Sequence, residues 1–128
     1  EAGLAPDQVD YLNAHGSYTP LNDPTESQAI RAVFGAHADQ LALSGTKGYF
    51  GHALGASGAI EAATCALAAQ RGWLPPTVNL GTPGEGCDLP YLVGAGRDAT
   101  PRHLMSNSFG FGGINAVLVM GGDSGAGG

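Results

Sequence analysis

The feature that most constrains the fold is an apolar segment rich in small residues, SGTKGYFGHALGASGAIEAATCALAAQRG, at positions 44–72. Its pattern predicts a helix over about 52–71 that ends at Gly72. Glycine costs a helix up to ~1 kcal/mol relative to alanine, so Gly51, Gly55 and Gly58 are tolerable where this helix packs very closely on a neighbouring element. The sequence therefore predicts one buried Gly/Ala-rich helix.

The rest of the chain alternates strands with helices. Strands are predicted at 9–15, 41–45, 103–109 and 114–120, and the GFGG turn between the last two predicts a hairpin. A first helix is predicted from Pro24 to Gly35, with Asp23 as its N-cap and Glu26 completing a capping box. Positions 77–100, rich in Gly and Pro, are expected to run over the surface. This order indicates an α/β fold, a mixed sheet with helices packed on it.

Composition limits what surrounds this domain. We assign 1–120 to one domain and 121–128 to a flexible tail, and we expect a longer protein because 1–8 resembles a helix end closed by Pro6. Only 12% of residues are charged, which favours a surface covered by another domain or subunit. The net charge of −6 argues against nucleic acid. With no cysteine motif, signal peptide or apolar span, we expect a cytoplasmic protein with no membrane partner.

Three groups that could do chemistry follow predicted strands. His15, Lys47 and the GFGG turn lie at or just after strand ends, and loops at the carboxyl ends of strands meet at one edge of a sheet. Lys47 is the only lysine of the chain, and Glu61 on the long helix could pair with it. Alternatively, Ser57, Glu61 and Thr64 could form a polar stripe that faces water.

The two histidines are candidates for oxyanion stabilisation. His52 is expected at the start of the long helix, where the helix dipole disfavours an imidazolium and favours a neutral hydrogen-bond donor. The alternative for His15 is a histidine satisfied at a strand end, and for His52 a residue near a helix cap. Phe111 could be a mobile apolar gate or a core residue of the hairpin. No serine or cysteine lies in a nucleophile motif, so the chain has the character of half an active site.

Three motifs carry a resemblance to a known family. NAHGSYTPLND, GTKGYFGHALGASGAIEA and NSFGFGGIN resemble, in order and spacing, the carboxy-terminal half of beta-ketoacyl-acyl carrier protein synthases of the elongating type I/II class. The resemblance implies a thiolase-like domain and a decarboxylative Claisen condensation of malonyl-carrier protein with an acyl thioester, in fatty acid or polyketide elongation. It also implies a nucleophilic cysteine on a separate amino-terminal half, a homodimer, and no cofactor, because phosphopantetheine arrives on the acyl carrier protein.

The resemblance also implies residue roles. His15 and His52 would stabilise the enolate, Lys47 with Glu61 would set the electrostatics, and Phe111 would be the gate whose N–H joins the oxyanion hole. Further positions are implied near the substrate or supporting the site: Ser17, Thr19, Glu26, Phe109, Gly110 and Gly112.

Departures from the family pattern leave alternatives open. The usual HGTSTP reads HGSYTP and KSMTGH reads KGYFGH, which puts the acyl-chain preference in doubt. Two histidines favour the elongating class over a His-Asn initiating class, and the GFGG loop lacks the second cysteine of degradative thiolases. A non-catalytic partner subunit like a chain-length factor is the alternative function. A metal hydrolase is weakly supported, because the spacing fits no metal motif.

Overall fold

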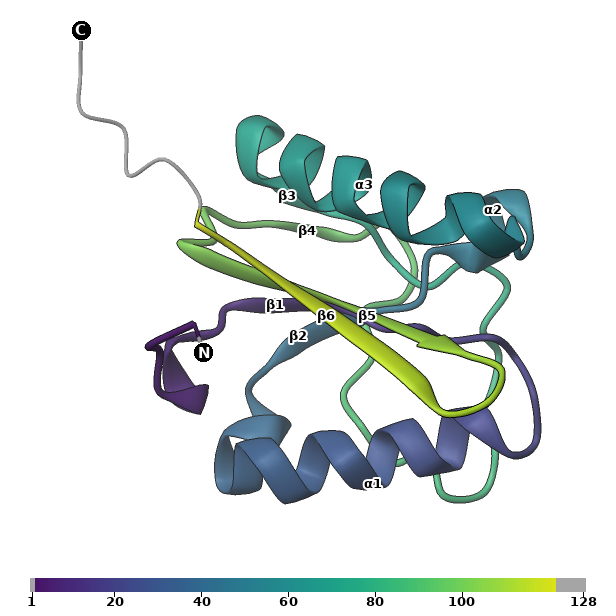
Figure 1. Ribbon diagram of the computed structural model, residues 1–128. Coiled ribbons are helices and arrows are strands. Elements are labelled where there is room, and N and C mark those ends of the chain that lie inside the picture. The colour runs from purple at the N-terminus through teal and green to yellow at the C-terminus, as the bar shows by residue number, and fades with distance from the viewer. Residues whose placement is uncertain (1, 122–128) are drawn as a thin grey trace, which may run out of the picture.

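The computed structural model describes residues 2–121 of the chain. Its principal elements are β1 (Tyr11–Asn13), α1 (Asn22–Phe34), β2 (Ala42–Ser44), α2 (Lys47–Phe50), α3 (Ser57–Arg71), β5 (His103–Gly110) and β6 (Ile114–Gly121) (Figure 1). Short 3₁₀ helices lie at Pro6–Gln8, Gly35–Asp39 and Leu54–Ala56.

The main sheet has four strands in the order β2-β1-β5-β6. Strand β1 pairs in parallel with both β2 and β5, whereas β5 and β6 form an antiparallel hairpin. The predicted mixed α/β architecture is therefore confirmed. Because β1, β2 and β5 run in the same direction, the loops that follow them gather at one edge of the sheet.

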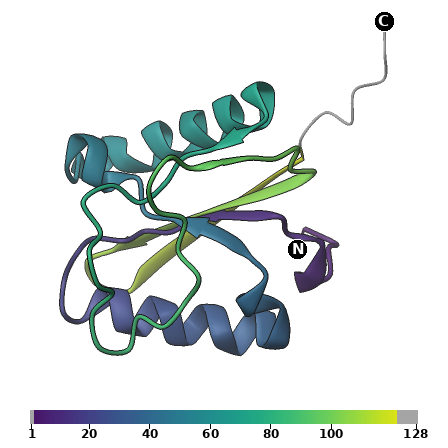
Figure 2. The same ribbon diagram turned by 180° about the vertical axis from the view of Figure 1, so that it is seen from behind.

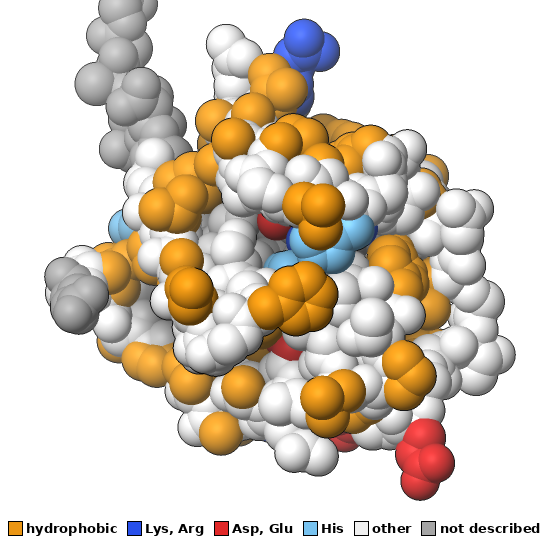
Figure 3. All heavy atoms as spheres, turned by 45° about the vertical axis from the view of Figure 1, so that its right-hand side comes forward, with side chains coloured by type: hydrophobic (Ala, Val, Ile, Leu, Met, Phe, Trp, Pro, Cys, Tyr) orange, Lys and Arg blue, Asp and Glu red, His pale blue; other side chains and the backbone are white. Residues whose placement is uncertain are grey.

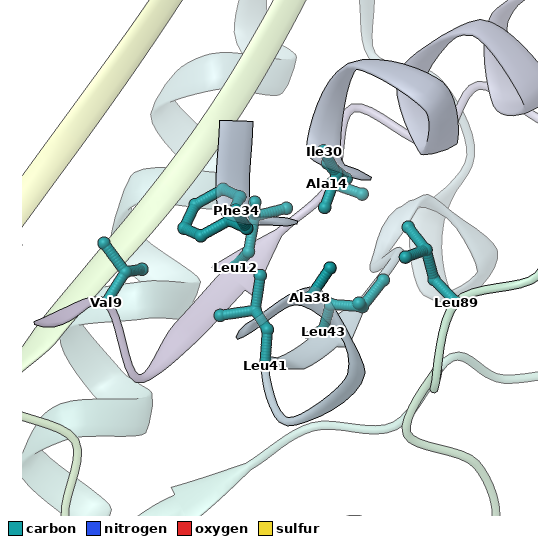
Figure 4. Close-up of a cluster of buried hydrophobic side chains, with 9 residues drawn as sticks. All are labelled: Val9, Leu12, Ala14, Ile30, Phe34, Ala38, Leu41, Leu43 and Leu89. Carbon is teal, nitrogen blue, oxygen red and sulfur yellow. The ribbon is translucent and has the colours of Figure 1, made fainter. Parts of the chain in front are cut away.

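Helices cover both faces of this sheet. Helix α1 lies against one face and α3 against the other (Figure 1), and the chain between β3 and β4 crosses behind the sheet (Figure 2). The side chains of the central strands alternate between two cores, with Leu12 and Leu43 turned to the α1 side and Tyr11 and Ala42 to the α3 side. Figure 4 shows the first core, formed by Val9, Leu12, Ala14, Ile30, Phe34, Ala38, Leu41, Leu43 and Leu89.

Helix α1 begins in a different way from the predicted cap. Its N-cap position is Leu21, which makes no side-chain hydrogen bond, and Asp23 lies within the helix. The capping-box prediction is wrong because the Glu26 carboxylate has stronger partners elsewhere, the backbone N–H groups of His15 and Gly16. The predicted end at Gly35 is confirmed.

The long helix starts later than predicted. Gly51, at φ +79°, ends the four-residue helix α2, and a 3₁₀ turn follows before α3 begins at Ser57. His52 therefore precedes the helix instead of occupying its first turn. The prediction of a buried helix holds for the face of α3 that packs on the sheet, where Ser57, Glu61, Cys65 and Ala68 are buried. On the outward face Leu67 is 52% exposed among the described residues.

Three further differences concern the edges of the fold. A two-stranded sheet, β3 (Trp73–Leu74) with β4 (Arg97–Asp98), was missed, since two-residue strands have no periodicity to detect. Pro6 opens a 3₁₀ helix and does not close one. Gly121 of the predicted tail ends β6, and 122–128 lie outside the described residues. Over the described part of the chain, no helix has the length and apolar character needed to cross a bilayer.

Candidate active site

The carboxyl ends of the parallel strands bring the candidate residues together, as predicted. His15 follows β1, Lys47 follows β2, and Phe109 lies near the end of β5. Lys47 Nζ lies 3.5 Å from His15 Nδ1, and the Phe109 backbone N–H donates to the same nitrogen at 3.3 Å. Figure 3 shows histidine side chains on this face of the molecule with hydrophobic side chains around them.

Lys47 and Glu61 form the predicted buried ion pair. Lys47 Nζ donates to Glu61 Oε1 and, at 2.5 Å, to the backbone carbonyl of His15. The two side chains are 1% and 0% exposed, so the alternative of a stripe facing water is wrong for Ser57 and Glu61. Burial raises the pKa of Glu61, and the Lys47 ammonium opposes this increase. The pair places a positive charge beside the buried His15, whereas His52 is exposed.

The His15 ring is held in one neutral tautomer. A backbone N–H can only donate, so the hydrogen bond from Phe109 makes Nδ1 an acceptor and leaves the ring proton on Nε2. Burial, then the charge of Lys47 and then His52 lower the pKa of His15 to about 4. At neutral pH, His15 is therefore an uncharged Nε2–H donor.

His52 has the same tautomer through different contacts. Its Nδ1 accepts the Leu54 backbone N–H at 3.1 Å and lies 3.3 Å from Ser57 Oγ. The proton of its neutral ring is therefore on Nε2. The two imidazole rings meet edge to face, with centroids 5.4 Å apart and planes at 77°. The site thus offers two neighbouring Nε2–H donors, the arrangement suited to an oxyanion.

Glu26 fixes the loop that carries His15. Its carboxylate accepts the N–H groups of His15 at 2.8 Å and Gly16 at 2.9 Å, and the Asn107 side-chain amide at 3.0 Å. These bonds tie α1, the His15 loop and β5 together. Gly16 adopts φ +45°, and a Cβ there would lie 3.4 Å from Gly45 Cα, so the two loops approach at backbone distance.

The other predicted site residues lie at varying depth. The ring of Phe109 packs 5.5 Å from that of His15. Phe111 stands at the hairpin tip, 97% exposed, next to Gly112 at φ +82°, and Gly110 ends β5. The hydroxyls of Ser17 and Thr19 hydrogen-bond each other at 2.9 Å. Thr19 also lines a cavity of about 810 Å³ between α1 and the segment 77–91.

Sequence reasoning missed the buried polar residues beside the site. Asn107 binds Glu26, and Asn13 exchanges hydrogen bonds with Thr46 at the strand ends. Asparagine is depleted within strands, and that rarity is the signal that could have singled out both. Cys65 is buried, and burial raises the pKa of its thiol to about 12. Within residues 2–121, no cluster of three His, Cys, Asp or Glu side chains could hold a metal ion.

Comparisons with known proteins give the family. Residues 1–81 match the family described as the beta-ketoacyl synthase C-terminal domain. The chain is 51% identical over 120 residues to 3-oxoacyl-[acyl-carrier-protein] synthase 2 of Coxiella burnetii, covering 94% of the chain and 29% of that protein. It is 46% identical to nodulation protein E of Rhizobium meliloti, covering 93% of the chain and 30% of that protein. The chain therefore spans about 30% of the length of these relatives.

Solved structures agree on the fold. AntDE:AntF, a type II polyketide acyl-carrier protein in complex with its ketosynthase, superposes with a TM-score of 0.88 at 38% identity, covering 92% of this chain and 29% of that one. The ishigamide ketosynthase/chain length factor superposes with a TM-score of 0.88 at 36% identity, and the match covers 93% of this chain and 29% of that one. With the family match over 1–81, the predicted thiolase-like class is confirmed, and the chain belongs to the beta-ketoacyl synthase C-terminal domain family.

Proposed function

We propose that this chain supplies the decarboxylation half of a beta-ketoacyl-acyl carrier protein synthase active site. The observation that carries the proposal is the pair of neutral imidazoles, His15 and His52, whose Nδ1 atoms both accept backbone N–H groups and whose Nε2–H groups are left to donate. Preorganised donors of this kind stabilise the charge that develops on an enolate oxygen. Lys47, paired with Glu61, adds positive charge beside His15.

The chemistry follows from these donors. The thioester carbonyl of a malonyl group on an acyl carrier protein accepts hydrogen bonds from both Nε2–H groups. The bond between the α-carbon and the carboxylate breaks, CO₂ leaves, and the electron pair is held as an enolate whose oxygen the two donors stabilise. The α-carbon then attacks an acyl group bound as a thioester to a cysteine, and that cysteine leaves as thiolate.

The cysteine is expected on an amino-terminal half that this chain does not contain. The outward apolar side chains support such a partner: Leu67 of α3 is 52% exposed, and Ile114, Val117, Leu118 and Val119 of β6 are 38–70% exposed. We use the term assembled enzyme for this chain together with that half. A homodimer of the assembled enzyme, and phosphopantetheine delivered by the carrier protein with no other cofactor, remain predictions.

The remaining residues are assigned supporting roles. Phe109 orients His15 through its N–H, and Glu26 holds the His15 loop. Ser17 and Thr19 would contact the phosphopantetheine arm as it enters. Phe111, exposed on a hairpin turn of glycines, is in a position to move as a gate, and its N–H is the expected oxyanion donor.

The test is malonyl-carrier protein decarboxylation by the assembled enzyme. Removing one oxyanion donor typically costs about 10²–10³ in rate, and we expect that loss for His15→Ala and for His52→Ala. His103→Ala is the matched control, because His103 Nδ1 hydrogen-bonds the Gln8 backbone carbonyl, and His103 begins β5 at the end opposite Phe109. Release of CO₂ at the wild-type rate by both site variants would overturn the proposal.

A chain-length-factor-like role is the second candidate, because one of the similar structures is a ketosynthase/chain length factor. A non-catalytic subunit does not require His15, Lys47 and His52. All three are present here, and His15 contacts both Lys47 and His52. The amino-terminal half decides between the two. A cysteine in a nucleophile position there predicts condensation by the assembled enzyme, and another residue there predicts a non-catalytic partner.

A further inference from the structure

Tyr18 has a backbone conformation that a bulky residue rarely adopts. Its φ is +59°, in the left-handed region, where the Cβ of a non-glycine residue is strained. The side chain is half exposed, and burial of the remainder raises the pKa of its hydroxyl. A strained residue two positions after Gly16 persists only where its side chain makes a compensating contact.

That contact is with the first turn of α2. A Cβ built on Gly48 would lie 2.9 Å from the Tyr18 hydroxyl oxygen and 2.9 Å from Val78 Cγ2, so the hydroxyl rests directly on the Gly48 backbone. The Gly48 backbone opposes the effect of burial on the pKa of Tyr18, as expected for a backbone group packed beside the hydroxyl. Thr46, the N-cap of α2, makes no side-chain capping bond. The Tyr18 hydroxyl therefore packs against a first turn whose own N-cap side chain makes no capping bond.

We propose that Tyr18 is a positioning residue that locks the His15 loop onto the turn that carries Lys47. Gly48 is the neighbour of Lys47, and Tyr18 belongs to the loop that starts at His15, so the contact joins the segment that carries Lys47 to the segment that carries His15. The role of Tyr18 in the reaction rests on the proposed function, whereas the lock itself does not.

Two structural measurements test the lock in the assembled enzyme. We expect Tyr18→Phe to speed amide hydrogen exchange in the peptide containing Gly48 by about fivefold, and Tyr18→Ala by more. Tyr49→Phe is the matched control. Tyr49 is also about half exposed and lies in α2 itself, so this variant removes a tyrosine hydroxyl from the same region. In a double-mutant cycle, Gly48→Ala should raise the unfolding equilibrium constant, because its Cβ would clash with the Tyr18 hydroxyl, and it should do so by a smaller factor in the Tyr18→Ala background than in the wild type.

A kinetic measurement tests the positioning. Tyr18→Ala should lower kcat for decarboxylation about tenfold with KM within twofold, and Tyr18→Phe, which keeps the ring, should recover part of that loss. Unchanged exchange near Gly48 in both Tyr18 variants, or additive effects in the cycle, would overturn the lock even if the assembled enzyme proves inactive. Normal kcat with altered exchange would overturn the positioning role alone. A wild-type assembled enzyme that does not decarboxylate would contradict the proposed function. The hydrogen-exchange measurement and the double-mutant cycle would still test the lock between Tyr18 and Gly48.

Discussion

At the residue scale, the site depends on which nitrogen of each imidazole is occupied. His15 and His52 both use Nδ1 as an acceptor, although one binds the backbone of β5 and the other binds the turn before α3. Backbone donors fix the tautomer more firmly than side chains, because their position is set by the secondary structure itself. The reactive direction of each ring is therefore determined by the fold.

The titration of His15 gives a direct prediction. NMR of labelled imidazole nitrogens should show a pKa of about 4, with the proton on Nε2 above that pH. Lys47→Met should raise this pKa, because the Lys47 charge lowers it. The pKa of an unperturbed histidine is about 6.5, so the unfolded chain binds a proton at higher pH than the folded chain. The contribution of His15 to stability is therefore complete above pH 6.5 and is lost as the pH falls towards 4. A His15 midpoint near 6.5 would contradict the burial and charge effects proposed here.

Glu26 gives a second prediction at this scale. The Glu26 carboxylate accepts hydrogen bonds from the N–H groups of His15 and Gly16 and from the Asn107 side-chain amide. Glu26→Gln replaces one carboxylate oxygen with an NH₂ group, which cannot accept from these donors. Hydrogen bonds to a charged group are worth about 1.5–3 kcal/mol, so we expect a loss of ~2 kcal/mol in the free energy of unfolding, measured with urea. Glu85→Gln, an exposed carboxylate on the segment 77–91, is the control and should change stability by less than ~0.5 kcal/mol. Equal effects of the two variants would show that the Glu26 contacts contribute little.

At the scale of elements, α3 reverses the usual amphipathic arrangement. It turns Ser57 and Glu61 towards the sheet and leaves Leu67 half exposed. The buried Glu61 is tolerable because Lys47 of α2 pairs with it, so an ion pair joins the two helices.

The ion pair between α2 and α3 can be tested by a double-mutant cycle. Breaking a buried pair by removing one partner costs about 3–5 kcal/mol, so Lys47→Met should lower stability by that amount. The double variant Lys47→Met with Glu61→Gln should lose less than the sum of the two single variants, because no charge is left unpaired. The exposed pair of Arg31 and Asp39 is the comparison, and Asp39→Asn should cost less than ~1 kcal/mol. Additive losses for Lys47 and Glu61 would contradict an energetic coupling of the helices.

At the scale of the whole molecule, β6 exposes a run of apolar side chains. Ile114, Val117, Leu118 and Val119 are all exposed, and β6 is an edge strand of the sheet. An edge strand with exposed apolar side chains invites pairing with another chain. This arrangement fits a domain whose surface is completed by the expected amino-terminal half.

The exposed strand gives the last prediction. By itself, the chain should bind a dye that reports exposed apolar surface, and should associate at micromolar concentration in analytical ultracentrifugation. Adding the amino-terminal half should reduce both signals, and Leu118→Lys should reduce self-association of the isolated chain. An isolated chain that stays monomeric and binds no dye would argue against a covered β6 face.

The sequence by itself determined the local structure and the identity of the reacting groups. The positions of β1, β2, the β5–β6 hairpin and the end of α1 follow from apolar runs, turn residues and Gly35, all of which act within a few residues along the chain. The same local signals placed His15 and Lys47 at strand ends, and the three motifs gave the family.

Only the tertiary structure decided how those groups are used. Glu61 pairs with Lys47 and does not face water. Glu26 binds the His15 loop and does not cap its own helix, and Tyr18 contacts Gly48. Each of these contacts depends on a partner far away in sequence. Asn107 is 81 residues from Glu26, and Phe109 is 94 residues from the ring nitrogen it binds. Local propensity cannot anticipate such contacts, because a buried polar group takes the partner that the packed fold brings to it.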